Sequence, residues 1–290
     1  MKICFLLISH WSGNLGGAEL QVKYIMQYLQ QHTDHELYYI CRKTTTDNDN
    51  GVTVYKITAS NFFTFRFKST DFVQINRYLD EIAPDIIYTR VSSAYVGIAA
   101  NYCKKNNCKL IYHIAHIEDV VPFALPSVGH IPKYLERALY VNGLKNADYI
   151  IGQAEYQNEL LYKHYGRKCT AIIPNFHPEA DNLPERKPGD IRNIVWVANI
   201  KVQKQPEMFI KLAKAFAHEK RLHFYMVGQI QHEKYIEEFE ALKDMPNLTY
   251  TGKLPVEEVN ALLANAYLFV NTSMQGAEGF PNTYIQAWMR

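Results

Sequence analysis

The sequence has few cysteines, and they do not follow the spacing of metal sites or disulfide frameworks. Five occur in 290 residues, an odd number, and no two form a C-x-x-C pair. Cys4 and Cys41 lie inside apolar runs that are typical of strands. This pattern indicates buried free thiols in a reducing compartment rather than a zinc site or a disulfide scaffold. We therefore expect a cytoplasmic protein that can also act at the inner face of the membrane.

The sequence also lacks a strong charge imbalance and a long apolar run. The net charge is +2, which argues against a nucleic-acid partner. The first apolar run extends only over residues 3–8 and leads into a glycine loop, so it predicts a core strand and not a signal peptide. No run approaches the ~18 apolar residues of a membrane span. The length and the 48% apolar content favour a globular protein of two domains.

What the sequence does contain is an alternation of short apolar runs with amphipathic stretches. Residues 2–9 predict a strand, Gly16 and Gly17 lie in the following loop, and residues 18–31 have helical periodicity. Such a unit opens a doubly wound α/β domain, in which ligands bind beyond the carboxyl ends of the strands. Because the loop is not G-x-G-x-x-G, it does not predict a dinucleotide site. Further strands are expected at residues 36–41, 52–57, 85–88, 109–113, 149–152 and 170–173, and helices at residues 71–82, 93–104, 133–146 and 157–165.

A polar, proline-rich stretch, PERKPGD at residues 184–190, predicts a domain boundary. The expected domains are residues 1–183 and 193–290, joined by a linker over residues 184–192. The second domain has predicted strands at residues 193–197, 222–227, 248–250 and 267–271, and helices at residues 206–217, 233–243 and 255–264. Four strands are fewer than the roughly six of a doubly wound nucleotide-binding sheet. We therefore expect this domain to be incomplete and the chain to be truncated at its C-terminus.

Residues 278–289, EGFPNTYIQAWM, predict a loop that leads into a helix. Asn282 is suited to cap a helix over residues 283–289. The bare N–H groups and the positive dipole end of such a helix can bind a phosphate. Glu278 before the helix can accept hydrogen bonds from hydroxyls, and Gln286 lies near the same side. The combination suits a sugar joined to a nucleoside diphosphate, and the alternative is an ordinary surface loop with a helix cap.

Taken together, these features resemble the GT-B fold, in which two doubly wound Rossmann-like domains face a cleft. In particular the sequence is similar to family 4 of the retaining glycosyltransferases. The residues that carry the resemblance are Gly16-Gly17-Ala18-Glu19, Ile173-Pro174-Asn175, VANIKVQKQ at residues 197–205, Val227-Gly228, Asn271-Thr272-Ser273 and EGFP at residues 278–281. The resemblance implies an N-terminal acceptor domain, a C-terminal nucleotide-sugar domain and hexosyl transfer from a UDP- or GDP-sugar. It implies a glycan or polyprenyl-linked acceptor in surface polysaccharide synthesis, and no metal or other cofactor.

The resemblance also implies roles for the donor residues. Glu278 occupies the first carboxylate position of the family's Glu-x7-Glu motif, which faces the donor sugar. The second position is Gln286 here, so the charge-assisted hydrogen bond to the ribose is lost. Lys204 matches the family lysine on the diphosphate, Asn199 stands where an arginine is usual, and Lys201 lies close enough to compensate. The remaining donor-binding residues are Gly16, Gly17, Gly279, Phe280, Pro281, Asn282 and Thr283.

In the first domain, the family places a catalytic histidine at the end of a central strand. His113 and His116 both fit, and His116 is preferred because the acidic pair Glu118-Asp119 follows it. A histidine at a strand end is also often a structural hydrogen bonder. Arg90, at another strand end, is expected to hold the acceptor or a phosphate, or to form an ion pair with a nearby carboxylate.

Residues 62–68, FFTFRFK, run from Phe62 to Lys68 and are both aromatic and basic. They predict either peripheral contact with a membrane or an apolar acceptor, or else a loop whose rings fold onto the core. Two other functions are compatible with the sequence. One is a catalytically inactive descendant that acts as a binding module, which Gln286 and Asn199 favour. The other is a nucleotide-sugar epimerase, whose extra carboxylates near the sugar are not evident.

Overall fold

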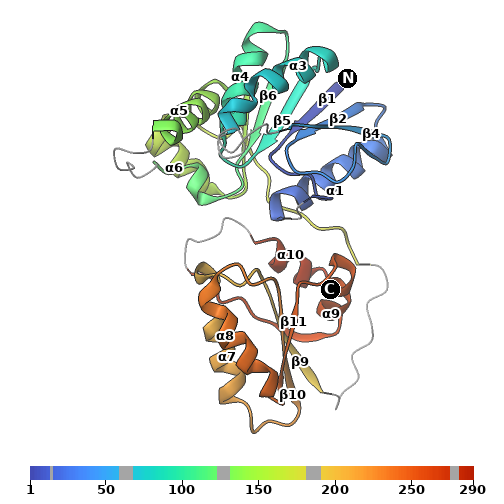
Figure 1. The fold of residues 1–290 in the computed structure, drawn as a ribbon, viewed down its shortest axis with the longest axis vertical. Helices are drawn as coiled ribbons and strands as arrows, with labels where there is room; N and C mark the ends of the chain where they lie inside the picture. The colour runs from blue at the N-terminus through green and yellow to red at the C-terminus, as the bar shows by residue number, and fades with distance from the viewer. Residues whose placement is uncertain (14–15, 59–67, 123–130, 181–190, 275–280) are drawn as a thin grey trace. The chain divides into compact units, whose positions relative to one another are not determined.

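The computed structural model describes residues 1–290 except 14–15, 59–67, 123–130, 181–190 and 275–280 (Figure 1). The chain forms two compact units, Met1–Asn175 and Phe176–Arg290, and each is described by itself below. Most of the linker expected over residues 184–192 lies outside the described residues, as does the aromatic stretch of residues 62–68 except Lys68. No described helix has both the length and the apolar composition required to cross a membrane.

The N-terminal unit is built on a sheet with eight described strands in the order β3-β4-β2-β1-β5-β6-β7-β8. All neighbouring pairs are parallel except β3 with β4. The strands are β1 (Lys2–Leu6), β2 (Glu36–Cys41), β3 (Asn48–Asp49), β4 (Val52–Lys56), β5 (Ile86–Arg90), β6 (Lys109–His113), β7 (Tyr149–Gly152) and β8 (Ala171–Ile172). Every strand predicted in this unit is confirmed. β3 was not predicted, because two residues are too short to show a period.

Helices cover both faces of this sheet. They are α1 (Gly17–His32), α3 (Phe72–Ile82), α4 (Ala94–Lys105), α5 (Ile131–Asn146) and α6 (Glu155–Tyr165), with 3-10 turns η1 (Lys68–Asp71) and η2 (Ile117–Asp119). Successive strand residues point to opposite faces. Accordingly Phe5 packs in a cluster with Met26 of α1, while Leu6 packs in the cluster of α3, α4 and α5. Burial on both sides explains why the strands read as nearly continuous apolar runs.

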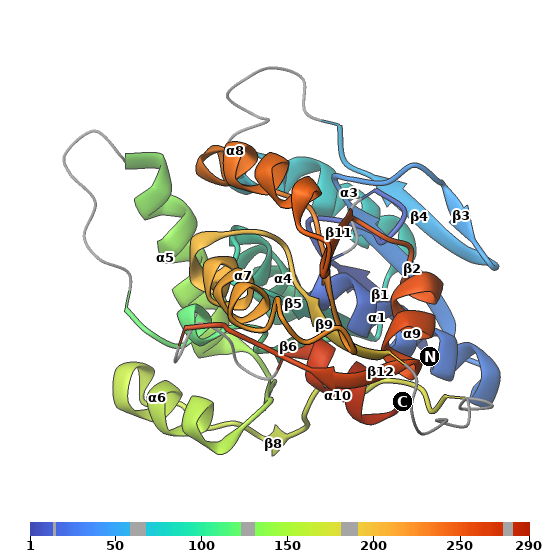
Figure 2. The same ribbon diagram turned by 90° about the horizontal axis from the view of Figure 1, so that it is seen from below.

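The C-terminal unit repeats this plan with four described strands in the order β11-β10-β9-β12, all parallel. The strands are β9 (Arg192–Val197), β10 (Leu222–Val227), β11 (Leu248–Gly252) and β12 (Ala266–Phe269). The helices are α7 (Pro206–Ala215), α8 (Ile236–Glu240), α9 (Val256–Ala264) and α10 (Asn282–Trp288), with 3-10 turns η3 (Val202–Lys204), η4 (Glu233–Tyr235) and η5 (Ala241–Asp244). α7 and α8 pack on one face of the sheet and α9 on the other (Figures 1 and 2).

Two predictions about this unit are wrong in detail. The single helix expected over residues 233–243 is divided into η4, α8 and η5. Tyr235, Phe239 and Leu242 all reach the core at spacings of four and three residues, which are typical of one α-helix, so the apolar pattern gave no signal of the two 3-10 turns. In α10, Asn282 is the first helical residue and Pro281 is the N-cap, with φ −63° and ψ 125°. The proline ring fixes φ, and the extended ψ places Pro281 outside the helix.

Candidate functional site

In the C-terminal unit the candidate site centres on Lys204, the last residue of η3. The segment from β9 through η3 is tied to the loop after β12, and β9 and β12 are neighbours in the sheet. The indole N–H of Trp196 donates to Thr272 Oγ1 at 2.9 Å, and the Thr272 hydroxyl donates to the Lys204 carbonyl at 2.6 Å. The backbone N–H of Met274 donates to the Gln203 carbonyl at 2.9 Å. These contacts fix Lys204 beside the chain that runs on into residues 275–280.

The ammonium of Lys204 is held in a poorly solvated position. Burial, together with the charge of Lys201, lowers the pKa of Lys204 to about 8. A desolvated cation gains more from an anionic ligand than a solvated one, because the ligand replaces water that the cation has already lost. Asn199, which follows β9, is exposed. The structure thus supplies one partly buried cation with a second, Lys201, close enough to act on it electrostatically.

Backbone approaches backbone closely at the carboxyl end of β10. Gly228 has φ +149°, and a Cβ at this position would lie 1.7 Å from the carbonyl oxygen of Ala198. Its N–H donates to the Gly252 carbonyl at 2.8 Å. Only glycine fits here. The Val227-Gly228 motif of the sequence is thus explained by packing just after the carboxyl ends of β9 and β10.

The loop before α10 is described only in part. Glu278, Gly279 and Phe280 lie outside the described residues. Pro281, Asn282 and Thr283 are half-buried at the start of α10. Of the positions in this stretch proposed for the donor sugar and diphosphate, the structure therefore describes Pro281, Asn282 and Thr283.

Gln286 has a partner that the sequence did not reveal. Its side chain is buried, and its Nε2 donates to Oδ1 of Asn260 in α9 at 2.6 Å. The amide thus helps to hold α10 against α9. A sequence motif spaced by eight residues contains no signal for this contact, because Asn260 lies 26 positions earlier. In this structure the Gln286 side chain is engaged in a hydrogen bond between two helices of the same unit.

In the N-terminal unit, Arg90 and His113 end the neighbouring strands β5 and β6 and are paired in register. The Arg90 guanidinium is buried, and its Nη2 donates to Asn175 Oδ1 at 2.9 Å. Its Nε and Nη1 are buried without a hydrogen-bond partner among the described residues. His113 shares a 2.7 Å hydrogen bond with the Tyr88 hydroxyl through Nδ1, and its Nε2 likewise has no partner in the described part of the chain. Burial and the charge of Arg90 lower the pKa of His113 to about 2, so the ring is neutral.

His116, the preferred catalytic histidine, lies after the end of β6 and is exposed. Its backbone N–H donates to Oδ2 of Asp119 at 3.0 Å. The same carboxylate accepts from the N–H of Ala115, and its other oxygen accepts from the N–H of Ser92. Asp119 is buried, so this acidic residue organises the loops after β5 and β6. The two histidines therefore occupy different environments.

The glycine loop leads into α1. Gly16 is the N-cap of α1, and its carbonyl accepts from Leu20 N at 3.0 Å. Gly17 is the first helical residue. Glu19 in the first turn is half-buried, and burial raises the pKa of this carboxyl group, an effect that Arg90 opposes. The Glu19 carboxylate, just after the glycine loop, and the Arg90 guanidinium are thus close enough for their charges to interact.

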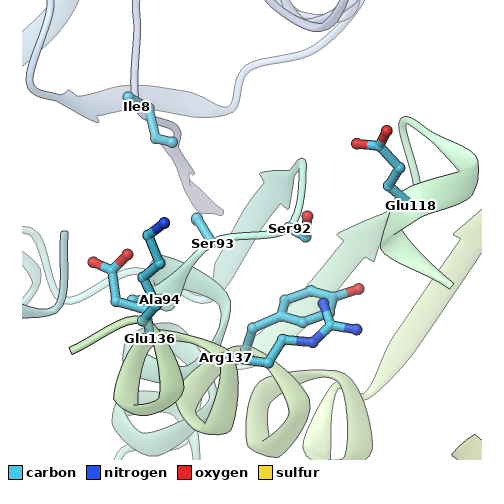
Figure 3. A pocket seen from close by; sticks show the side chains of 9 residues that line it. Ile8, Ser92, Ser93, Ala94, Glu118, Glu136 and Arg137 are labelled. Atoms are coloured by element: carbon cyan, nitrogen blue, oxygen red, sulfur yellow. The ribbon is translucent and has the colours of Figure 1, made fainter. Parts of the chain in front are cut away.

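A pocket of about 300 Å³ opens at the carboxyl ends of the strands in this unit (Figure 3). Figure 3 shows Ser92 and Ser93 between Ile8, Glu118 and two α5 side chains. Its lining carries both signs of charge and consists of Ile8, Ser92, Ser93, Ala94, Glu118, Lys133, Glu136, Arg137 and Tyr140. Ser93 caps α4 by accepting from Tyr95 N at 3.3 Å. Sequence analysis missed this pocket, although a serine before a helical run was a visible cap signal.

Potential metal ligands are not clustered in the part of the chain that the structure describes. The sequence contains one Asp-x-Asp triplet, Asp47-Asn48-Asp49, in and before β3. Asp49 accepts a 2.7 Å hydrogen bond from the Trp11 indole and lies 3.5 Å from His10 Nε2. Asp49 is therefore engaged in holding the loop after β1.

Comparisons with known proteins agree with this architecture. Residues 15–179 match a family model described as Glycosyltransferase Family 4, and residues 191–290 match one described as Glycosyl transferases group 1. The chain belongs to glycosyltransferase family 4. Its GT-B-like α/β fold has one larger and one smaller parallel sheet. Among curated proteins, no sequence matches the chain.

Solved structures of the same fold share little sequence with this family member. HepE from Anabaena, in complex with UDP and glucose, is 18% identical with a TM-score of 0.72, over 100% of this chain and 78% of HepE. WaaG, a glycosyltransferase involved in lipopolysaccharide biosynthesis, is 14% identical with a TM-score of 0.71, over 99% and 78%. The lipopolysaccharide outer core galactosyltransferase WaaB is 16% identical with a TM-score of 0.64, over 100% and 78%. These likenesses show the fold.

Proposed function

We propose that this protein is a retaining glycosyltransferase that moves a hexose from a UDP- or GDP-sugar to a glycan or polyprenyl-linked acceptor. The observation that carries the proposal is the partly desolvated ammonium of Lys204, a residue whose backbone carbonyl accepts a hydrogen bond from Thr272 in the loop after β12. A cation in this state is suited to a diphosphate. Surface polysaccharide synthesis is the proposed setting, and a lipid-linked acceptor at the cytoplasmic face of the membrane agrees with the aromatic and basic residues 62–68.

In the proposed reaction the nucleoside diphosphate departs from the anomeric carbon, which gains oxocarbenium character. Lys204, assisted by Lys201, stabilises the charge that develops on the leaving diphosphate. Glu278 accepts hydrogen bonds from the sugar hydroxyls. Other proposed donor contacts come from Gly16, Gly17, Asn199, Gly279, Phe280, Pro281, Asn282 and Thr283. Because fixed cations and N–H groups provide this stabilisation, no metal ion is needed in the proposal.

On the acceptor side, Arg90 offers buried N–H groups that lack partners among the described residues. An unsatisfied buried guanidinium is costly, and an oxygen-rich or phosphorylated acceptor relieves that cost. His116 is proposed to contact the donor sugar from the exposed end of the β6 loop. The acceptor hydroxyl loses its proton to the leaving phosphate as the new bond forms, so the reaction needs no enzymatic general base.

The test is saturable binding of UDP- and GDP-sugars by titration calorimetry, compared between the wild type and Lys204→Ala. We expect binding to be lost in Lys204→Ala and reduced about tenfold or less in the matched control Lys201→Ala, since the main contact to the diphosphate is proposed for Lys204. Adding a chelator should leave binding unchanged. If a correctly folded chain binds none of these donors, the proposal is refuted.

A second function, a binding module without turnover, is favoured by one observation. Gln286 stands at the second carboxylate position and is hydrogen-bonded to Asn260. Asn260 therefore occupies one of the two N–H donors of this amide, which leaves fewer for a ribose. Release of nucleoside diphosphate, measured with and without added glycan, distinguishes the two functions. Donor binding without any release, by hydrolysis or by transfer, would support the binding module.

A further inference from the structure

Cys103 and Cys108 lie in contact at the amino end of β6, away from the candidate site. Cys103 is in the last turn of α4, and Cys108 immediately precedes β6. The S–H of Cys103 donates to Cys108 Sγ, with 3.1 Å between the sulfur atoms. Two sulfur atoms at this distance need to approach by only about 1 Å to reach the ~2.05 Å of a disulfide bond. The pair is thus close to a bonded geometry without a change of fold.

The pair is reachable from solvent although both residues are buried. Cys103 is 9% exposed and Cys108 is 5% exposed. Both line an open pocket of about 420 Å³ whose rim is rich in lysine and asparagine. Its lining consists of Ala100, Cys103, Lys104, Lys105, Asn106, Asn107, Cys108, Lys109, Asn146 and Asp148. A small, neutral oxidant can enter such a pocket and reach the sulfur atoms.

The two thiols are not equivalent. The hydrogen bond from Cys103 lowers the pKa of the Cys108 thiol, and it raises the pKa of Cys103. Asp148 and Asp85 oppose the ionisation of Cys108, but the Asp148 carboxylate is 2.8 Å from the Lys109 ammonium. Since the thiolate is the reactive form, Cys108 is the nucleophile and Cys103 the resolving thiol.

The other cysteines lack this arrangement. Cys4 and Cys41 are fully buried in β1 and β2, and burial raises the pKa of each thiol. Cys169 is partly exposed, and burial raises the pKa of its thiol to about 11. Oxidation at low oxidant concentration should therefore select one pair of sulfur atoms.

We propose that Cys103 and Cys108 are a reversible oxidation site, which a hydroperoxide converts into an intramolecular disulfide. The Cys108 thiolate attacks one oxygen of hydrogen peroxide, the O–O bond breaks, and the other oxygen leaves as hydroxide, which takes up the proton that the Cys108 thiol released and forms water. The Cys108 sulfenic acid then loses its oxygen as a second water when Cys103 sulfur attacks. In sum, two thiols and one hydrogen peroxide give one disulfide and two waters. Fast closure protects both sulfurs from irreversible oxidation.

The disulfide encloses only the end of α4 and the short loop to β6. Asn106 and Asn107 in this loop are exposed, so it can adjust as the sulfur atoms approach. His113 lies at the opposite, carboxyl end of β6. Sugar-donor binding is therefore expected to be unchanged, and the oxidation site stands or fails independently of the proposed transferase function.

The experiment treats the reduced full-length chain with one to two equivalents of hydrogen peroxide and then blocks free thiols under denaturing conditions. We expect the number of titratable thiols to fall from five to three and the unblocked mass to fall by about 2 Da, the two hydrogens lost. Digestion without reductant should join Cys103 to Cys108, and dithiothreitol should restore all five thiols.

Three variants make the test specific. Cys169→Ser should still lose two thiols. In Cys103→Ser, the Cys108 thiol should instead gain about 16 Da as a sulfenic acid, because no resolving thiol is present. Cys108→Ser should resist oxidation at the same dose. Five intact thiols in the wild type, a crosslink to Cys4, or oxidation at Cys169 before the pair would each overturn the proposal.

Discussion

Replacing Lys204 by Met should stabilise the protein while it removes the proposed donor contact. The ordinary lysine pKa of 10.5 falls to about 8 at Lys204, and this difference corresponds to roughly 3.4 kcal/mol of destabilisation of the charged folded state. Solvent screening of a side chain that is only partly buried reduces the effect, so we expect Lys204→Met to raise the free energy of unfolding by about 1–2 kcal/mol at pH 7.

The way the stability difference between Lys204→Met and the wild type changes with pH distinguishes desolvation of the ammonium from an effect of side-chain packing. Below about pH 8 the folded and unfolded chains both carry the Lys204 proton, and the full destabilisation is present. Between about pH 8 and 10.5 the unfolded chain retains a proton that the folded chain has lost, so wild-type stability rises with pH. The advantage of Lys204→Met should therefore shrink over this window.

The measurement is urea unfolding at pH 7 and pH 10, followed by tryptophan fluorescence. Two of the three tryptophans, Trp196 and Trp288, lie in the C-terminal unit and report its unfolding. Lys201→Met is the matched control in the same loop and should change stability by less than about 0.5 kcal/mol. A Lys204→Met variant that is no more stable at pH 7, or whose advantage persists at pH 10, would refute the idea that Lys204 is strained by desolvation.

Three further predictions concern stability. Gly228→Ala should destabilise the C-terminal unit by about 3 kcal/mol or more in urea unfolding. Gly252→Ala, at φ +71° with open space around it, should cost only about 1–2 kcal/mol. Equal losses would contradict the close backbone approach at Gly228. His113 stays neutral in the folded chain down to about pH 2, whereas the unfolded chain takes up a proton below about pH 6.5. The free energy of unfolding should therefore fall by up to about 1.4 kcal/mol per pH unit as the pH drops below 6.5. In acid unfolding, His113→Gln should reduce this pH dependence. Asp71→Asn breaks the buried ion pair with Arg42, whose Nη2 donates to Asp71 Oδ1 at 2.7 Å. This change should lower the free energy of unfolding by about 3–5 kcal/mol, measured from the denaturant midpoint. A decrease under about 1 kcal/mol would show that the pair is dispensable.

The sequence predicted the strands well because most of them are buried on both faces and read as apolar runs. Its error at the end of β5 falls where polar residues are buried. β5 was expected to end at Tyr88 but continues to Arg90. Thr89 is buried because its hydroxyl donates to the Leu6 carbonyl at 2.7 Å, and Arg90 is buried beside Asn175. Both partners are more than 80 positions away, so no local pattern could reveal them.

In the candidate site, too, the sequence predicted residues but not the contacts that they make. Lys204 was predicted from its motif, but its burial and its tie to Thr272 come from the neighbouring positions of β9 and β12. Gln286 was predicted to face the donor, and its partner Asn260 became visible only with the packing of α10 on α9. Between His113 and His116 the sequence offered only the following acidic pair, while the structure shows one ring buried and the other exposed.

The hydrogen bond from Trp196 to Thr272 should make the fluorescence of Trp196 sensitive to movement of the Lys204 loop. The indole is almost completely buried, and its N–H is joined through one hydroxyl to the carbonyl of Lys204. Any ligand that shifts the Lys204 loop must lengthen or bend this short relay and alter the emission of the indole. With Trp11 and Trp288 replaced by Phe, a single buried fluorophore would report loop movement in real time, without a label and without knowledge of the acceptor.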